Sequence, residues 1–158
     1  YIADALSRAP VTKPDKDCVS LQEEVEGFMD SITKYLPATH DRLQQYCSSQ
    51  ASDPICAQVI KYCRFGWPDK HHVADNIKPY WIHQSLFSVH KGLLLFKNRI
   101  VVPKTLQRET LTKIHSGHLG VQRCRLRTLQ SVWWPGVTEE VEQMVKNCRL
   151  CEKKCPGP

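Results

Sequence analysis

The chain has 158 residues, enough for one ordinary domain or two small ones, and its 41% apolar content can supply a core. No segment approaches the roughly 18 consecutive apolar residues of a membrane helix, so we expect no membrane partner. The chain also begins without Met and without a signal-peptide pattern, from which we expect it to come from within a longer protein.

The positive charge is concentrated in the C-terminal third. Residues 97–155 hold 12 Lys and Arg against 5 Asp and Glu, a balance of +7, whereas the rest of the chain has a balance of −1. A basic surface suits a phosphate backbone, because neutralising phosphates releases counterions. Charge alone is also compatible with a solubilising face, so it makes DNA a candidate partner without identifying it.

The eight cysteines do not follow the pattern of a disulfide framework. Four are scattered singly and three crowd the C-terminus: Cys18, Cys47, Cys56 and Cys63, then Cys148, Cys151 and Cys155. A disulfide scaffold usually spreads its cysteines along a short secreted chain that carries a signal sequence. We therefore predict a reducing, intracellular compartment.

The N-terminal half is predicted to be helical after an initial linker. Residues 1–16 carry prolines and charges and indicate a chain end followed by a linker. Apolar residues at helical spacing predict a first helix over Ser20–Leu36, which Pro37 ends.

Two further helices are expected before residue 67. One covers Asp41–Ser48. The next has Asp53 as its N-cap and Pro54 at its first position, and Gly66 is expected to supply a left-handed C-cap.

The periodicity changes to that of strands after residue 83. Short β-prone runs over Leu86–Val89, Leu93–Phe96 and Arg99–Val102 are separated by Lys-Gly and Lys-Asn turns. They predict a small antiparallel meander that Pro103 closes.

Three helices are predicted after the meander, over Thr105–His115, Val121–Ser131 and Thr138–Cys148. The middle one would present its apolar face through Val121, Cys124, Leu126 and Leu129. Thr138 is the expected N-cap of the last helix, and residues 133–136 form the corner before it.

Trp133 and Trp134 could stack on the bases of a nucleic acid. We prefer the interpretation that at least one of them packs in the core beneath a metal site.

Two His and two Cys have the spacing of a metal site. Cys148 and Cys151 form a C-x-x-C pair, and His115 and His118 offer two imidazoles at the end of an earlier helix. About 30 residues separate the pairs, which is room for two helices and a corner that return the thiols to the imidazoles. Four N and S ligands form a closed tetrahedral site, so we expect one structural zinc and no catalysis by it.

Other assignments of the site residues are weaker. Cys155 is a possible substitute ligand for His115, as is a distant histidine, whereas Cys124 fits a buried helix position better. His71 and His72 lie in a charged loop and are expected to be exposed to solvent, whereas His40, His83 and His90 lack partners at ligand spacing. No complete catalytic set is visible, so the chain is not expected to be an enzyme alone.

The ordered motifs His115–Gly120, Val132–Gly136 and Cys148–Cys151 resemble the integrase zinc-binding (H2C2 or HHCC) domain of gypsy-type LTR retrotransposons. The resemblance covers roughly residues 103–154. The segment Ala3–Arg8 is similar to the end of the RNase H domain that precedes integrase in such Pol polyproteins. The two-residue spacer between His115 and His118 is shorter than is usual in retroviral relatives.

The resemblance implies a zinc-binding, DNA-binding part of a retrotransposon integrase that holds element ends and self-associates. Magnesium would belong only to a catalytic core outside this chain. The expected location is the nucleus or a cytoplasmic virus-like particle. The predicted phosphate contacts are basic residues of the last helices: Lys113, Arg123, Arg125, Arg127 and Lys146. The alternative is a domesticated host protein that uses the same zinc-stabilised domain for protein interaction.

The predicted fold is mainly α with a small antiparallel β meander. Its expected order is a tail and linker over 1–16, a helical extension over 17–80, the meander over 81–103 and a zinc-stabilised three-helix bundle over 104–158.

Overall fold

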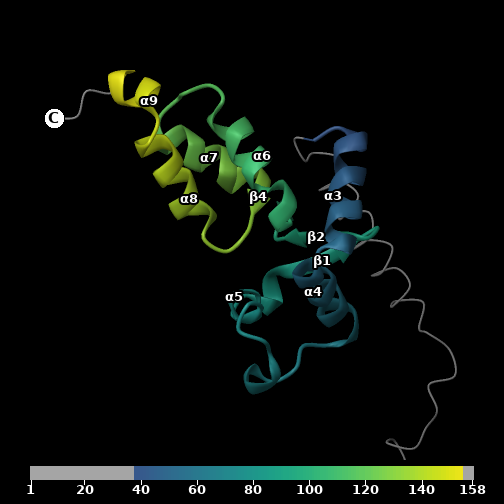
Figure 1. The fold of residues 1–158 in the computed structure, drawn as a ribbon. Coiled ribbons are helices and arrows are strands. Elements are labelled where there is room, and N and C mark those ends of the chain that lie inside the picture. Colours follow the sequence, from purple (N-terminus) through teal and green to yellow (C-terminus); the bar gives the residue numbers. More distant parts are fainter. Residues whose placement is uncertain (1–37, 155–158) are drawn as a thin grey trace, which may run out of the picture. The chain divides into compact units, whose positions relative to one another are not determined.

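The computed structural model describes residues 38–154, which all fall within one unit of the chain. The predicted helix Ser20–Leu36 and Cys155 therefore lie outside the described residues. Within 38–154, helices outnumber strands and one small sheet is present (Figure 1), so the predicted fold class is confirmed. No helix in this part of the chain is both long and apolar enough to cross a membrane.

Among the described residues, helices precede and follow three consecutive strands, and a fourth strand lies between two later helices. The α-helices are α3 (His40–Ser52), α4 (Pro54–Phe65), α5 (Lys78–Trp81), α6 (Lys104–His115), α7 (Val121–Ser131), α8 (Val137–Lys146) and α9 (Arg149–Lys154). Two 3-10 turns are η1 (Lys70–His72) and η2 (Gln84–Leu86). The strands are β1 (Phe87–His90), β2 (Leu93–Phe96), β3 (Arg99–Val101) and β4 (Val132–Trp133).

Asp53 begins α4 as predicted and also connects two parts of the fold. Its Oδ1 accepts hydrogen bonds from the backbone N–H groups of Ile55 and Cys56, at 3.0 and 2.9 Å. Its Oδ2 accepts from the N–H of Lys104, the first residue of α6, at 3.3 Å. The prediction for Gly66 was wrong in detail, because its φ of 105° is positive but its ψ of 149° is extended.

The sheet has the strand order β1-β2-β3-β4. The first three strands form the predicted antiparallel meander. The fourth was not predicted: β4 pairs in parallel with β3, with Ile100 opposite Val132 and Val101 opposite Trp133. The sequence interpretation placed the last residue of this strand in a corner, because a strand of two residues has too few positions for a period-two pattern.

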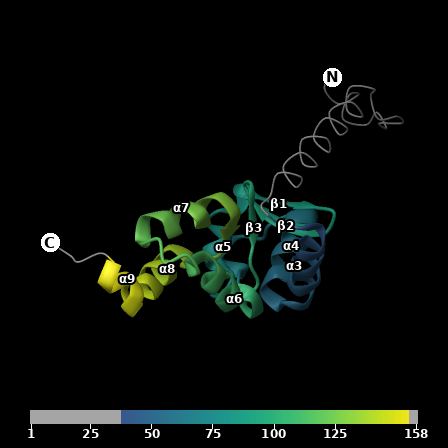
Figure 2. The same ribbon diagram turned by 90° about the horizontal axis from the view of Figure 1, so that it is seen from above.

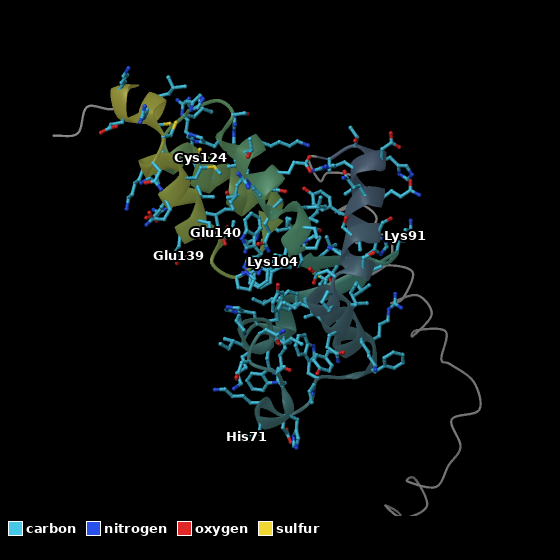
Figure 3. The ribbon with its side chains drawn as sticks, in the orientation of Figure 1. His71, Lys91, Lys104, Cys124, Glu139 and Glu140 are labelled. Carbon is cyan, nitrogen blue, oxygen red and sulfur yellow. The ribbon has the colours of Figure 1, made fainter. Side chains whose placement is uncertain are left out.

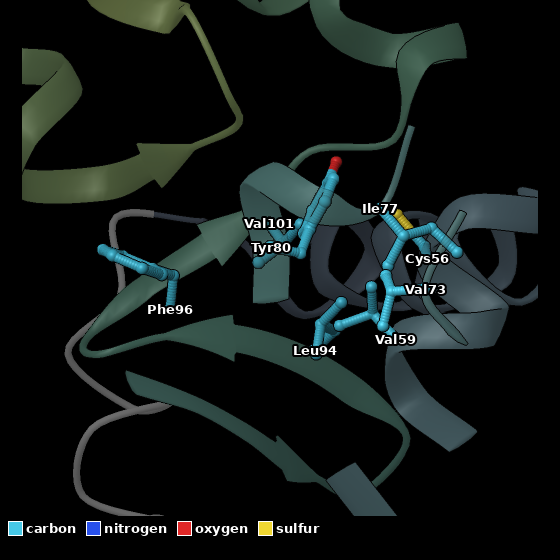
Figure 4. Close-up of a cluster of buried hydrophobic side chains, with 8 residues drawn as sticks. All are labelled: Cys56, Val59, Val73, Ile77, Tyr80, Leu94, Phe96 and Val101. Atoms are coloured by element: carbon cyan, nitrogen blue, oxygen red, sulfur yellow. The ribbon is translucent and has the colours of Figure 1, made fainter. Parts of the chain in front are cut away.

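The core of the sheet is closed by α4 and by the segment that follows it (Figure 4). Cys56 and Val59 of α4 pack with Leu94 of β2 and Val101 of β3, and none of these four side chains is more than 1% exposed. Trp133 of β4 joins the other side of this core, where its ring stacks on Phe96 at 4.2 Å with an interplanar angle of 9°. The strand β4 is therefore held by side chains as well as by backbone pairing.

Helices α6, α7 and α8 pack together at the end of the structure away from α4, as both ribbon views show (Figures 1 and 2). Trp134, predicted as a candidate core residue, is 1% exposed. The predicted apolar face of α7 was partly wrong, since Leu126 and Leu129 are each 57% exposed. Cys124 of the predicted face is buried, together with Thr128, which is four residues further along the helix and so shares its face.

The expected cap of α8 was also wrong. The helix begins at Val137, one residue before Thr138, and its N-cap is Gly136 in the left-handed region with a φ of 84° and no side-chain cap. A glycine can reverse the chain direction here without a Cβ clash, so the first helical turn starts before the threonine.

Gln50 is expected to be the most sensitive polar residue of the α3–sheet contact. Its buried amide donates to the carbonyls of Leu94 and Val101 at 3.0 and 2.6 Å and accepts from the N–H of Leu94 at 2.7 Å. Gln50→Ala removes all three bonds, so urea unfolding of the metal-loaded chain should show a loss of at least about 2 kcal/mol. Gln44→Ala, at an exposed position of the same helix, should cost less than about 0.5 kcal/mol. Equal losses would contradict this role.

Candidate metal centre

Four predicted ligands converge at the junction of α6, α8 and α9. His115 is the last residue of α6, His118 lies in the turn before α7, Cys148 follows α8, and Cys151 lies in α9. Four donor atoms, one from each of these residues, all lie within 4.8 Å of one another. The four side chains could therefore hold one metal ion, and no other such group of three or more is found among residues 38–154.

The backbone between the two histidines is bent tightly, which brings both rings to one place. The N–H of His118 donates to the carbonyl of His115 at 2.8 Å, and His118 itself has a φ of 45°. Gly120 follows with a φ of 82° and starts α7. The two imidazoles meet edge to face, with ring centroids 4.7 Å apart.

The distances between donor atoms fit a tetrahedral zinc site. Cys148 Sγ lies 3.3 Å from His118 Nδ1, and Cys151 Sγ lies 3.6 Å from His115 Nε2 and 3.8 Å from His118 Nδ1. With Zn–S bonds of about 2.3 Å and Zn–N bonds of about 2.0 Å, a tetrahedron requires N–S separations of about 3.5 Å. The residues therefore fit the ion in both chemistry and spacing.

The directions of the pKa shifts of His115 and Cys148 favour metal binding. Burial, with the neighbouring His118 adding to it, lowers the pKa of His115, which favours the neutral imidazole that metals bind. A hydrogen bond from the Cys151 backbone lowers the pKa of Cys148 and so favours its thiolate. Burial, reinforced by the adjacent Cys148 thiol, raises the pKa of Cys151. Cys148 therefore loses its proton more readily than Cys151, and a divalent cation would favour the thiolate form of both.

Cys124 forms a second layer behind His115. It is 1% exposed, as expected for a buried helix residue, and lies in the helical part of the molecule that carries the site (Figure 3). Its Sγ lies 3.9 Å from His115 Nδ1, the ring nitrogen that does not face Cys151, and 3.8 Å from the carbonyl of Ile114. A ring nitrogen that is not bound to metal usually needs such a partner to fix the tautomer and the ring orientation.

The other histidines lie elsewhere. His71 and His72 are exposed in η1, and His71 is at the opposite end of the described structure from Cys124 (Figure 3). Cys155, the substitute ligand considered from the sequence, falls outside the described residues.

The five predicted phosphate contacts do not form one group. Arg125 and Lys146 both pair with Glu142, the latter at 3.8 Å. Arg123 is exposed on α7. Lys113 and Arg127, by contrast, line one groove together with Arg42 of α3. Sequence reasoning missed Arg42, because it lies about 70 residues before Lys113 in a segment without excess charge.

The geometry defines a class of small helical domain that is closed by a two-His, two-Cys metal site. Residues 102–156 match the family model of the integrase zinc binding domain. An uncharacterized protein of Caenorhabditis elegans is 31% identical over 108 residues, which are 67% of this chain and 8% of that relative. The chain thus spans only a small part of the relative's length, and no solved structure matches it significantly. The chain therefore contains an integrase zinc-binding domain.

Replacing Cys124 should weaken zinc binding without removing a ligand. In Cys124→Val the His115 ring keeps a side chain of similar volume beside it but loses its partner at Nδ1, so zinc affinity should fall by about 10- to 100-fold. Competition with a chelating dye measures this fall, and circular dichroism checks the helix content. Cys63→Val, at a half-buried cysteine of α4, is the matched control. Equal zinc affinities in the two variants would assign Cys124 to packing alone.

Proposed function

We propose that His115, His118, Cys148 and Cys151 hold one structural zinc ion, and that the domain so formed is the DNA-binding part of a retrotransposon integrase. The observation that carries the proposal is the approach of four N and S atoms to within 4.8 Å, inside a segment that matches the integrase zinc binding family. Four protein ligands leave no open position for water, so the ion would stabilise the fold and take no part in chemistry.

The proposed role of the domain is to hold the ends of the element and to help integrase chains assemble during DNA integration. Its basic residues would contact phosphates, which positions a duplex without reading its sequence. Magnesium and strand transfer would belong to another part of a Pol polyprotein, whose RNase H domain would end near Arg8. Such a protein would act in the nucleus or in a cytoplasmic virus-like particle.

A second candidate function has one specific observation in its favour. Leu126 and Leu129 lie on α7 and are each 57% exposed, an arrangement that would suit a protein-binding face. A domesticated host protein could use the zinc-stabilised domain in this way. The two functions differ in their dependence on DNA.

The ligand assignment is tested by metal content. The double variant Cys148→Ser/Cys151→Ser should lose the single zinc of the purified chain and much of the helix content of residues 104–154, because binding energy here is folding energy. Cys47→Ser/Cys63→Ser, which removes two half-buried thiols of α3 and α4, should keep one zinc per chain. One zinc retained by the first double variant would show that the ligands are different residues.

DNA binding separates the two candidate functions. The zinc-loaded chain should be retained on immobilised duplex DNA at low salt and released as salt rises, because displaced counterions drive the binding. Chelation of the zinc should abolish this retention, since the basic helices lose their arrangement. Absence of retention even at low salt would favour the protein-interaction module.

A further inference from the structure

A groove of about 530 Å³ lies between α3, α6 and α7, away from the four candidate metal ligands. Its polar lining comes from all three helices: Arg42, Tyr46, Thr110, Lys113, Arg127 and Ser131. No Asp or Glu is among the described residues that line it. The groove therefore brings three cations together from parts of the chain that are distant in sequence.

We propose that this groove binds a backbone phosphate of a DNA strand. The inference rests on the proposed DNA-binding function and gives it a location. It also adds Arg42 to the predicted phosphate contacts. Lys113 and Arg127 would bind the same phosphate as Arg42.

Arg42 carries a buried N–H donor that could bind an anion. Its side chain is 19% exposed, and its Nη1 donates to Gln45 at 2.6 Å and lies 3.0 Å from a carboxylate oxygen of Glu109. Its Nη2 is buried and has no hydrogen-bond partner in the described part of the chain. A buried guanidinium N–H without an acceptor is costly, and a phosphate oxygen is the acceptor that best matches the planar fork of arginine.

The charges around the groove leave room for an anion. Glu109, at its edge on α6, lies 3.0 Å from Arg42 and 2.7 Å from Lys113, so one carboxylate serves two cations. Arg127 has only a neutral acceptor at hand, since its Nη1 donates to the carbonyl of Ile114 at 3.3 Å. Among residues 38–154, the three cations of the groove thus face one carboxylate, which is not part of the groove lining.

The remaining lining favours a phosphodiester over a hydrated ion. Hydroxyl groups of Tyr46 and Thr110 lie 3.3 Å apart, and because Thr110 already donates to the carbonyl of Leu106 at 2.8 Å, the Tyr46 hydroxyl is the one that can turn to donate to a ligand oxygen. Apolar side chains of Ile100, Ile114 and Val132 form part of the wall, and an apolar wall strengthens the attraction between an anion and the cations beside it. A strand would leave the groove along α6 and α7, in the part of the chain that carries the excess positive charge.

The groove is coupled to the candidate metal centre through one carbonyl. Ile114, the residue before His115, accepts from Arg127 in the groove and from the Cys124 thiol behind the metal ligands. Binding of His115 to an ion would therefore also hold the Ile114 carbonyl in place, and with it the hydrogen bond that positions Arg127 in the groove.

The test measures binding of a fluorescein-labelled DNA duplex by fluorescence anisotropy, with the zinc-loaded full chain at several salt concentrations. Arg42→Gln should weaken binding roughly five- to tenfold near about 0.1 M salt and reduce the slope of log K against log salt by about 0.9, the value of one phosphate contact. Glu109→Gln should strengthen binding, because it frees Arg42 and Lys113. Arg108→Gln, which removes one exposed charge of α6 outside the groove, is the matched control and should leave the slope unchanged.

Two outcomes would contradict the proposal that the groove binds a phosphate. One is an equal effect of Arg42→Gln and Arg108→Gln, which would leave general DNA binding intact and reject only this location. The other is unchanged or weaker binding in Glu109→Gln. If Arg42→Gln loses its zinc or its helix content, Arg127→Gln tests the same groove from an exposed position. If the unmodified chain fails to bind the duplex at low salt, the proposed DNA-binding function fails together with the groove.

Discussion

The C-terminal part of the structure depends on the approach of two imidazoles and two thiols at the end of three helices. Packing alone cannot explain this arrangement. Among the side chains of α9 that the structure describes, only Cys151 is buried, and Leu150, the one large apolar residue, is 54% exposed. A six-residue helix with one buried side chain has too little apolar contact to hold its place. A shared ion that binds Cys148 and Cys151 would supply what the core lacks.

The sheet and its core form a second centre of stability, and β4 connects it to the first. This strand directly follows α7, pairs with β3 and places Trp133 on Phe96. The family match begins at residue 102, yet the segment it covers completes a sheet whose other strands lie before that residue. The orientation of α7 is therefore fixed at one end by the sheet and at the other by the turn that carries His118.

Local chemistry made much of this fold predictable. Asp53 followed by Pro54 specifies a helix start through backbone dihedrals and side-chain hydrogen bonds, and the ligand spacing favoured one set of four with Cys155 or a distant histidine as the alternative to His115. The predictions failed where tertiary packing determines which side chains are buried and which short elements form. Periodicity placed Cys124 correctly on the buried face of α7, but it also placed Leu126 and Leu129 there and could not tell that Thr128 would be buried in their stead. A two-residue strand and the six-residue α9 carry too little pattern to be detected.

The formal charge of a sequence segment does not show which of its charges remain unpaired in the folded chain. Counting residues assigns the positive excess to residues 97–155, but pairing with Glu142 occupies Arg125 and Lys146 in the folded chain. The groove that brings three cations together, two of them paired with the same carboxylate, instead draws Arg42 from a segment whose formal charge is close to balanced. Binding strength depends on local charges that lack partners and on the dielectric around them. The contact of α3 with α6, made through the pair of Arg42 and Glu109, thus places a cation of the N-terminal half beside two cations of the basic C-terminal third.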